Sequence, residues 1–164
     1  MKRRNMIGLS AIAAGGAVSR PLHAAAYARQ EKPRRKLKIL VAGAHPDDPE
    51  TGCGGTILRY TNAGHDVTAF YLTRGEAGIP GISHNEAAKI RTAELTEACK
   101  IMNARPIFGS QIDGNTEVNS ERYAAVKQML DNEKPDIIFT HWPVDTHRDH
   151  RVCSVLIYDA WLAQ

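Results

Sequence analysis

The chain of 164 residues has only three cysteines, at positions 53, 99 and 153. Three cysteines cannot complete a disulfide framework, and none of their spacings fits a cysteine-based zinc site. Cys53 and Cys99 fall within expected helices, so we interpret them as small buried side chains. One disulfide with a leftover thiol is the alternative for an exported protein.

Acidic residues are absent from the first 28 positions, which hold four basic residues. A Lys-Arg-Arg start precedes a mildly apolar run over 6–18, and small residues that follow offer cleavage sites. This pattern predicts an export signal over 1–28 and a linker over 29–35, and hence a periplasmic or extracellular protein. The paired arginines favour the twin-arginine route, with an ordinary Sec signal as the alternative. The apolar run is shorter than the ~20 residues of a membrane span, so we expect no stable membrane anchor.

A basic surface is also missing from the rest of the chain. When the four basic residues of the signal are removed from the 21 lysines and arginines, 17 remain against 18 acidic residues. Nucleic-acid binding requires clustered positive charge, so we exclude it as a function. The sequence contains no motif from which an oligomeric state is predicted.

Short apolar runs alternate with helix-like segments along residues 36–164. The runs predict strands over 37–42, 67–72, 106–108 and 136–140, and the segments between and after them predict helices over 50–63, from Ser83 onward, over 121–132 and from about His150 to the end. Gly64 is expected to close the first helix, and Ser83 with Glu86 forms a capping box. The alternation predicts an α/β fold, Rossmann-like and three-layered, with a mostly parallel sheet. Because the fourth strand would be an exposed edge, we expect a C-terminally truncated domain or an early natural stop.

Two polar motifs follow the first and fourth expected strands. His45-Pro46-Asp47-Asp48 follows the first strand, and His147-Arg148-Asp149-His150 follows the fourth. In a Rossmann-like strand order these two strands are neighbours where the order reverses, and ligands bind beyond their carboxyl ends. We therefore expect the two motifs to form one site.

The residue types of both motifs are those of a catalytic metal centre. Histidine nitrogens and carboxylates three positions apart suit a zinc ion with three protein ligands and one open position. The acids of the first motif could instead be a helix N-cap, which leaves His45 unexplained. A single histidine of the second motif could be a surface residue. Two of them with Asp145 and Asp149 interleaved favour a metal site, since ligating histidines usually contact a carboxylate through the second nitrogen.

The chain resembles the PIG-L/LmbE-like family of zinc-dependent N-deacetylases. The resemblance covers roughly residues 36–164 and is carried by four segments, at 44–50 (AHPDDPE), 52–56 (GCGGT), 72–76 (LTRGE) and 142–150 (WPVDTHRDH). It implies that His45, Asp48 and His150 hold zinc. It further implies that Asp47 is the general base for the attacking water, and that a protonated His147 stabilises the oxyanion. Fe²⁺ or another divalent metal could replace zinc.

Arg74 resembles the family's substrate-binding arginine, and its guanidinium suits sugar hydroxyls or a phosphate. A salt bridge with Glu76 is the alternative interpretation. Arg91 and Glu94 lie three positions apart on the second helix, so we expect a structural pair. The glycines at 52, 54 and 55 lack the Gly-Lys-Ser/Thr ending of a phosphate loop, and we expect close helix packing there.

The resemblance implies a hydrolase that removes an N-acetyl group from an amino sugar such as N-acetylglucosamine, or from a conjugate of it. The partner is then a small-molecule or glycan substrate. Two alternatives stay open. One is an amidase that cleaves a larger acyl or thiol-conjugate amide in the same site, and the other is a non-catalytic module that binds a glycan or a metal.

Overall fold

The computed structural model describes residues 35–164 of the chain. The predicted export signal over 1–28 and all but the last residue of the predicted linker over 29–35 lie outside the described residues. Within them, no helix is long and apolar enough to cross a membrane.

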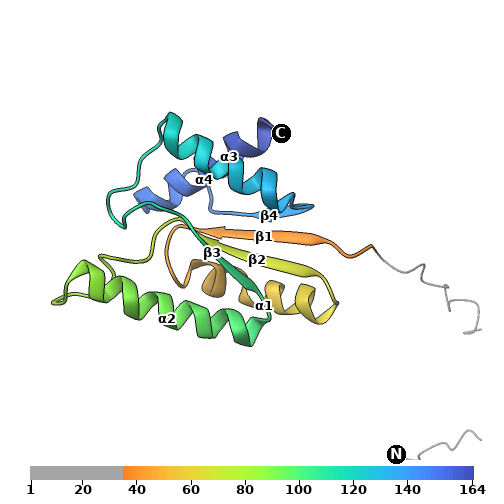
Figure 1. Ribbon diagram of the computed structural model, residues 1–164, viewed down its shortest axis with the longest axis horizontal. Coiled ribbons are helices and arrows are strands. Elements are labelled where there is room, and N and C mark those ends of the chain that lie inside the picture. The colour runs from red at the N-terminus through yellow and green to blue at the C-terminus, as the bar shows by residue number, and fades with distance from the viewer. Residues whose placement is uncertain (1–34) are drawn as a thin grey trace, which may run out of the picture. The chain divides into compact units, whose positions relative to one another are not determined.

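Four strands and four helices alternate along the described residues (Figure 1), as the sequence predicts. In chain order they are β1 (Lys38–Gly43), α1 (Asp48–Asn62), β2 (Asp66–Tyr71), α2 (His84–Met102), β3 (Arg105–Phe108), α3 (Ser120–Glu133), β4 (Ile137–Phe139) and α4 (Arg148–Leu162). The predicted helix ends are also present. The Ser83 side chain accepts a hydrogen bond from the Glu86 backbone N–H, and Gly64 follows α1 with a φ of 84°.

The sheet is parallel throughout, with the strand order β3-β2-β1-β4. β1 pairs with β2 along its whole length and with β4 from Ile39 to Val41. β2 and β3 are therefore added on one side of β1, and β4 is added on the other side. This reversal of strand order confirms the Rossmann-like order and the three-layered α/β fold.

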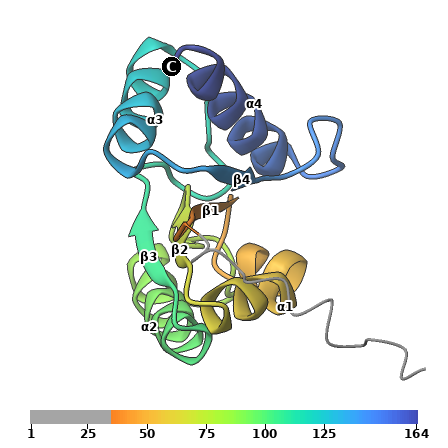
Figure 2. The ribbon, with the colours of Figure 1, turned by 90° about the vertical axis from the view of Figure 1, so that its right-hand side faces the viewer.

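Helices cover both faces of the sheet, with α1 and α2 on one side and α3 and α4 on the other (Figure 2). The side chains of β1 alternate between these layers, as the pleat of a strand requires. Ile39 packs with Ile57 of α1 beneath the sheet, whereas Leu40 packs with Leu130 of α3 and Leu156 of α4. Both faces of the strand are buried, which explains its continuous apolar sequence.

The expectation of close packing at the α1 glycines is wrong for two of the three. A Cβ added to Gly52 or Gly55 would meet nothing within 4 Å, and one on Gly54 would only approach Met102 Sδ at 3.9 Å. Gly43, at the end of β1, is the crowded position. A Cβ there would lie 2.6 Å from Asp48 Cβ and 2.7 Å from Pro49 Cδ. The missing side chain of Gly43 lets the polar loop fold back over the end of β1.

We expect Gly43→Ala to lower the free energy of unfolding by about 1–3 kcal/mol, because the new methyl group overlaps the start of α1. Gly55→Ala is the matched control. Its methyl group enters open space in an exposed helical position, so stability should rise by up to about 1 kcal/mol. Urea denaturation of both variants measures the difference. Equal stability of Gly43→Ala and the parent protein would show that the loop yields at no cost.

Candidate functional site

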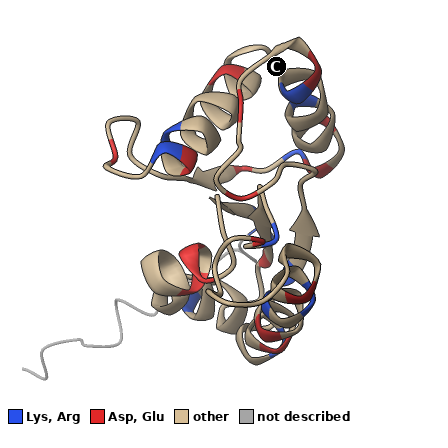
Figure 3. Ribbon diagram, turned by 90° about the vertical axis from the view of Figure 1, so that its left-hand side faces the viewer, with Lys and Arg blue, Asp and Glu red and all other residues tan. Residues whose placement is uncertain are grey.

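The polar motifs meet at the carboxyl edge of the sheet. The loop after β1 carries the first motif, and the loop after β4 with the first turn of α4 carries the second. His45 and Asp149 are 104 positions apart in sequence, yet His45 Nε2 lies 3.2 Å from Asp149 Oδ2. Figure 3 views the molecule from this edge and shows acidic residues in red on the loops and helix starts around the strand ends.

Asp48 is the hub of the site. Its Oδ2 accepts the His45 backbone N–H at 2.7 Å and lies 3.2 Å from His141 Nε2, while its Oδ1 lies 3.3 Å from His150 Nε2. Its side chain is only 13% exposed. Burial alone would raise the pKa of Asp48, but the hydrogen bonds with His141 and His45 outweigh it and hold that pKa well below its usual range. Asp48 therefore stays an anion that joins the two motifs.

His45 is surrounded by three carboxylates. Nδ1 lies 3.4 Å from Asp48 Oδ2, and Nε2 lies 3.1 Å from Asp113 Oδ1 and 3.2 Å from Asp149 Oδ2. Burial would lower the pKa of His45, but these carboxylates outweigh it and raise the pKa to about 9. Positive charge is thus stabilised at this point of the structure.

Asp149 is held from three directions and is only 1% exposed. Thr116 Oγ1 donates to its Oδ1 at 2.7 Å, and the Gly114 backbone N–H donates to its Oδ2 at 2.8 Å. Burial tends to raise the pKa of Asp149, and these two donors together with His45 lower it on balance. The histidine that Asp149 contacts is His45.

Asp145 occupies the corresponding position beside His150. Its Oδ1 accepts the His147 backbone N–H at 2.7 Å and lies 3.3 Å from His150 Nδ1. The backbone N–H of His147 is the main cause of a lowered pKa of Asp145. Since the other ring nitrogen of His150 faces Asp48, this ring lies between two carboxylates. That is the arrangement expected of a ligating histidine with its orienting partner.

His147 caps α4 with its ring. Its Nδ1 accepts the Asp149 backbone N–H at 3.2 Å, which fixes the orientation of the imidazole. The ring centroid lies 4.7 Å from that of His45 and 4.7 Å from that of His150, and the side chain is exposed. With Nδ1 engaged by the helix, Nε2 is the ring nitrogen left to donate a hydrogen bond to a bound molecule.

Three overlapping groups of ligand atoms each lie within 4.8 Å of one another. They are His45 with His147 and His150, Asp48 with His141 and His150, and His45 with Asp113 and Asp149. Each predicted ligand (His45, Asp48 and His150) belongs to at least one group, and Asp48 contacts both of the other two. None of these three groups contains all three residues, so the ligand set stays a prediction.

The donor set fits a divalent metal. Imidazole nitrogens and carboxylate oxygens are ligands of both zinc and iron. The carboxylates of Asp48, Asp113, Asp145 and Asp149 converge on a few histidine rings, and they would stabilise a dication among them. A structure that already raises the pKa of His45 in this way favours a positive ion at the same place.

Asp47 stands apart from the three groups. Its side chain is 59% exposed, and its Oδ2 pairs with Arg91 Nη2 at 2.6 Å. It is next to Asp48 in sequence, but its carboxylate pairs with Arg91, whereas the carboxylate of Asp48 contacts histidines.

Arg74 lines a pocket of about 430 Å³ beside the site, together with His84, Ser110 and Gln111. Its guanidinium lies 5.9 Å from the centroid of the Phe108 ring. The alternative interpretation, a salt bridge with Glu76, does not occur in the described part of the chain. Glu76 Oε2 instead accepts the backbone N–H groups of Arg74 and Asp113. The pocket and the histidine cluster are therefore joined through the loop that carries Asp113.

Sequence reasoning missed Asp113 as a site residue and did not assign a role to His141. Asp113 follows β3 and His141 follows β4, so both emerge at the same edge as His45. The His141 ring stacks on that of His150, with centroids 3.9 Å apart and an angle of 7° between the planes. A position in the loop that follows a parallel strand was the signal for both.

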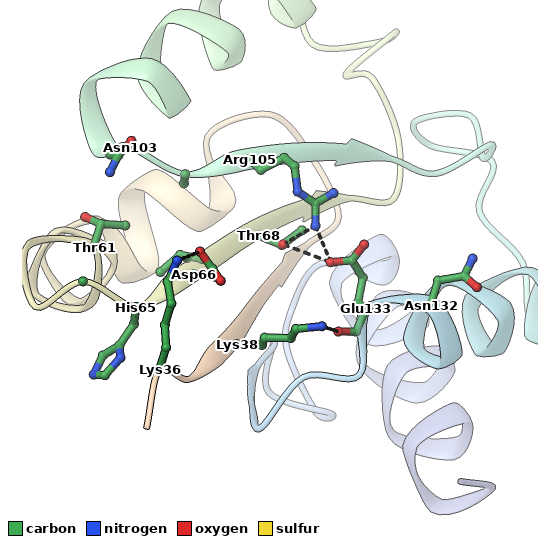
Figure 4. Close-up of a pocket in the computed structure, with 13 residues that line it drawn as sticks. Lys36, Lys38, Thr61, His65, Asp66, Thr68, Asn103, Arg105, Asn132 and Glu133 are labelled. Carbon is green, nitrogen blue, oxygen red and sulfur yellow. Dashed lines mark hydrogen bonds and ion pairs between the residues drawn. The ribbon is translucent and has the colours of Figure 1, made fainter. Parts of the chain in front are cut away.

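A pocket of about 640 Å³, larger than the one that Arg74 lines, lies at the opposite edge of the sheet (Figure 4). Its charged residues pair with one another. Lys36 Nζ lies 2.7 Å from Asp66 Oδ1, and Arg105 pairs with Glu133. None of the predicted site residues lines this pocket, so size does not identify the site.

Similarity to known proteins agrees with this geometry. A diacetylchitobiose deacetylase from Thermococcus kodakarensis is 32% identical over 130 residues, which are 75% of this chain and 48% of that protein. A 1D-myo-inositol 2-acetamido-2-deoxy-alpha-D-glucopyranoside deacetylase from Kineococcus radiotolerans is 38% identical over 91 residues, 52% of this chain and 25% of that protein.

Among solved structures, an N,N'-diacetylchitobiose deacetylase from Pyrococcus horikoshii superposes with a TM-score of 0.72 at 27% identity, and the match covers 77% of this chain and 49% of that one. The chain thus spans about half or less of the length of these relatives. The model of the family described as PIG-L, GlcNAc-PI de-N-acetylase, matches residues 40–161. With the family's motif residues gathered at one edge of its sheet, the chain belongs to the PIG-L family.

Proposed function

We propose that this protein is a metal-dependent hydrolase that removes the acetyl group from the 2-acetamido group of an amino sugar or its conjugate. The observation that carries the proposal is the meeting of the two motifs around Asp48, which joins histidines from both strand ends in one site. The named activities of the relatives support the substrate class, because both act on acetylated glucosamine derivatives.

In this proposal His45, Asp48 and His150 hold the metal, with zinc as the expected ion and Fe²⁺ as the alternative. Such an ion lowers the pKa of a bound water to about 7 and polarises an amide carbonyl. Asp145 and Asp149 keep the ligating rings in place through the contacts described above. Arg74 and its pocket bind sugar hydroxyls beside the reacting amide.

The proton transfers are assigned to this chain's own side chains. Asp47 takes a proton from the attacking water as the oxygen bonds to the carbonyl carbon, and the proton later passes to the leaving amine. His147 donates from Nε2 to the carbonyl oxygen as negative charge develops there. Cleavage of the C–N bond gives acetate and the free amino sugar.

Metal removal is the first test. We expect acetate release from N-acetylglucosamine and diacetylchitobiose to stop after chelation and to return when Zn²⁺ or Fe²⁺ is added. The pKa of about 9 for His45 gives metal binding a pH dependence. Below that pH the metal-free ring is protonated, so an incoming ion must displace a proton and the apparent affinity should fall by up to about tenfold per pH unit.

Calorimetric titration of the metal in buffers of different ionisation enthalpy measures the released proton. The His65→Ala variant is altered at the opposite edge of the sheet, so it is the control and should release the same proton as the parent protein. Acetate release that survives complete metal removal contradicts the proposed mechanism. A series of longer N-acyl groups separates the deacetylase from the amidase alternative. Metal or glycan binding without any hydrolysis would instead indicate the non-catalytic module.

Asp47→Asn should lower kcat by about 10²–10⁴, the usual contribution of a general base, while bound metal stays at the parent level. His150→Ala is the comparison variant and should lose the metal itself. Kinetics and metal analysis of the same preparations separate these effects. Loss of metal from Asp47→Asn would make Asp47 a ligand and overturn the division of roles between the two aspartates.

His147→Asn should lower kcat by about 10²–10³, since the donor to the oxyanion is removed. Asparagine is a good helix N-cap, so the start of α4 should keep its stability. His147→Ala removes both functions, and its free energy of unfolding should fall by about 1 kcal/mol more than that of His147→Asn. Activity assays and urea denaturation measure the two effects separately. Full activity of His147→Asn would rule out the assigned role.

A further inference from the structure

The backbone at Asp47 has a conformation that this residue rarely adopts. Its φ of 94° lies in the left-handed region, which costs energy for any residue with a Cβ. Asp47 is also the N-cap of α1, where an aspartate normally accepts a backbone N–H of the first turn. Its side chain makes no such bond. The carboxylate therefore does not cap α1, and another part of the structure has to stabilise this turn.

Arg91 of α2 holds the turn from both sides. Its Nη2 donates to the Pro46 carbonyl oxygen at 2.6 Å and to Asp47 Oδ2 at 2.6 Å, so one guanidinium nitrogen joins the peptide before Asp47 to the Asp47 side chain. Arg91 is 23% exposed. The expected pair with Glu94 exists but is longer, at 3.4 Å, and Glu94 is 58% exposed. The pattern i, i+3 along α2 therefore misses the main contacts of Arg91.

The loop after β2 presses Arg91 against the turn. Gly75 has a φ of 68°, and a Cβ at this position would lie 3.1 Å from Pro46 Cδ and 3.4 Å from Arg91 Cγ. The backbone of this loop thus packs against both partners, and the arginine side chain has little room to move.

Glu50, in the first turn of α1, adds a further negative charge near Arg91. Glu50 Oε1 accepts the hydroxyl of Tyr71 at 2.6 Å, and Tyr71 is fully buried. Glu50 Oε2 and Arg91 Nε are both buried, and neither has a hydrogen-bond partner among residues 35–164. Burial would lower the pKa of Arg91, but its hydrogen bond with Asp47 and the charges of Asp47, Glu94 and Glu50 raise it on balance.

We propose that Arg91 is a positioning residue that keeps Asp47 in its left-handed turn through its paired contacts with the Pro46 carbonyl oxygen and the Asp47 carboxylate. Arg91 binds Oδ2 and leaves Oδ1 of the same carboxylate for the attacking water. The exposed side chain of Asp47 would otherwise be free to return to the capping position. The inference rests on the proposed function for the role of Asp47, although the geometry of the turn is independent of it.

The test compares Arg91→Met, Arg91→Lys and the control Glu94→Gln, which removes only the surface partner. Arg91→Met should lower kcat on the order of 10- to 100-fold, because a misplaced base loses its alignment with the reacting atoms. KM and bound metal should stay within about twofold of the parent values. Arg91→Lys should recover part of kcat through one of the two contacts, and Glu94→Gln should match the parent protein.

A crystal structure of Arg91→Met gives a readout that does not need activity. We expect the φ of Asp47 to leave the positive region and its carboxylate to turn to the first amides of α1. A left-handed Asp47 in this variant would overturn the proposal, and so would an unchanged kcat or a parallel loss of metal. If Arg91→Met does not fold, Arg91→Lys takes its place, and its kcat should still lie below the parent value with KM unchanged. If the parent protein releases no acetate, the proposed function fails, and the crystal structure still decides the role of Arg91.

Discussion

The parallel pairing of β1 with β4 is the constraint on which the site depends. It joins residues 39–41 to residues 137–139, far apart in the chain, and sets the two strand ends side by side. Each strand is followed by a short loop rich in histidine and aspartate, so the pairing places these loops in contact. Leu40 and Val41 are buried on opposite faces of the sheet, and a shift of one residue in β1 would turn both the wrong way. The apolar core therefore also fixes the register of the polar site.

Charge complementarity is the second level of organisation. Carboxylates and imidazoles alternate in space, so that His45 and His150 each lie between acids. Leaving so many carboxylates close together at a low dielectric would be costly without positive charge between them. The metal-free protein meets this need in part by stabilising a proton on His45. The proposed ion would meet it in full, which links the stability of the site to its chemistry.

The fold and the meeting of the motifs could be predicted from the sequence because both follow from local patterns and general topological rules. The apolar run at 37–42, Gly64 and Ser83 each have one clear local meaning, and the order of parallel strands does the rest. The contacts of Arg91 could not be predicted in this way. Its partners Pro46 and Asp47 lie in the loop between β1 and α1, and the sequence periodicity of α2 contains no information about them. The prediction of close packing at the glycines of α1 was wrong for the same reason, because the space around a helix surface is a property of the packed structure.

Asp149 ties together the loops after β1, β3 and β4, through His45, the pair Gly114 and Thr116, and its own place at the start of α4. A buried anion with partners on three loops makes them one cooperative unit. Displacing any single loop would leave charge or a donor stranded in the other two, at the cost of an unsatisfied buried group. The three loops at the rim of the site therefore hold their relative positions through one buried carboxylate.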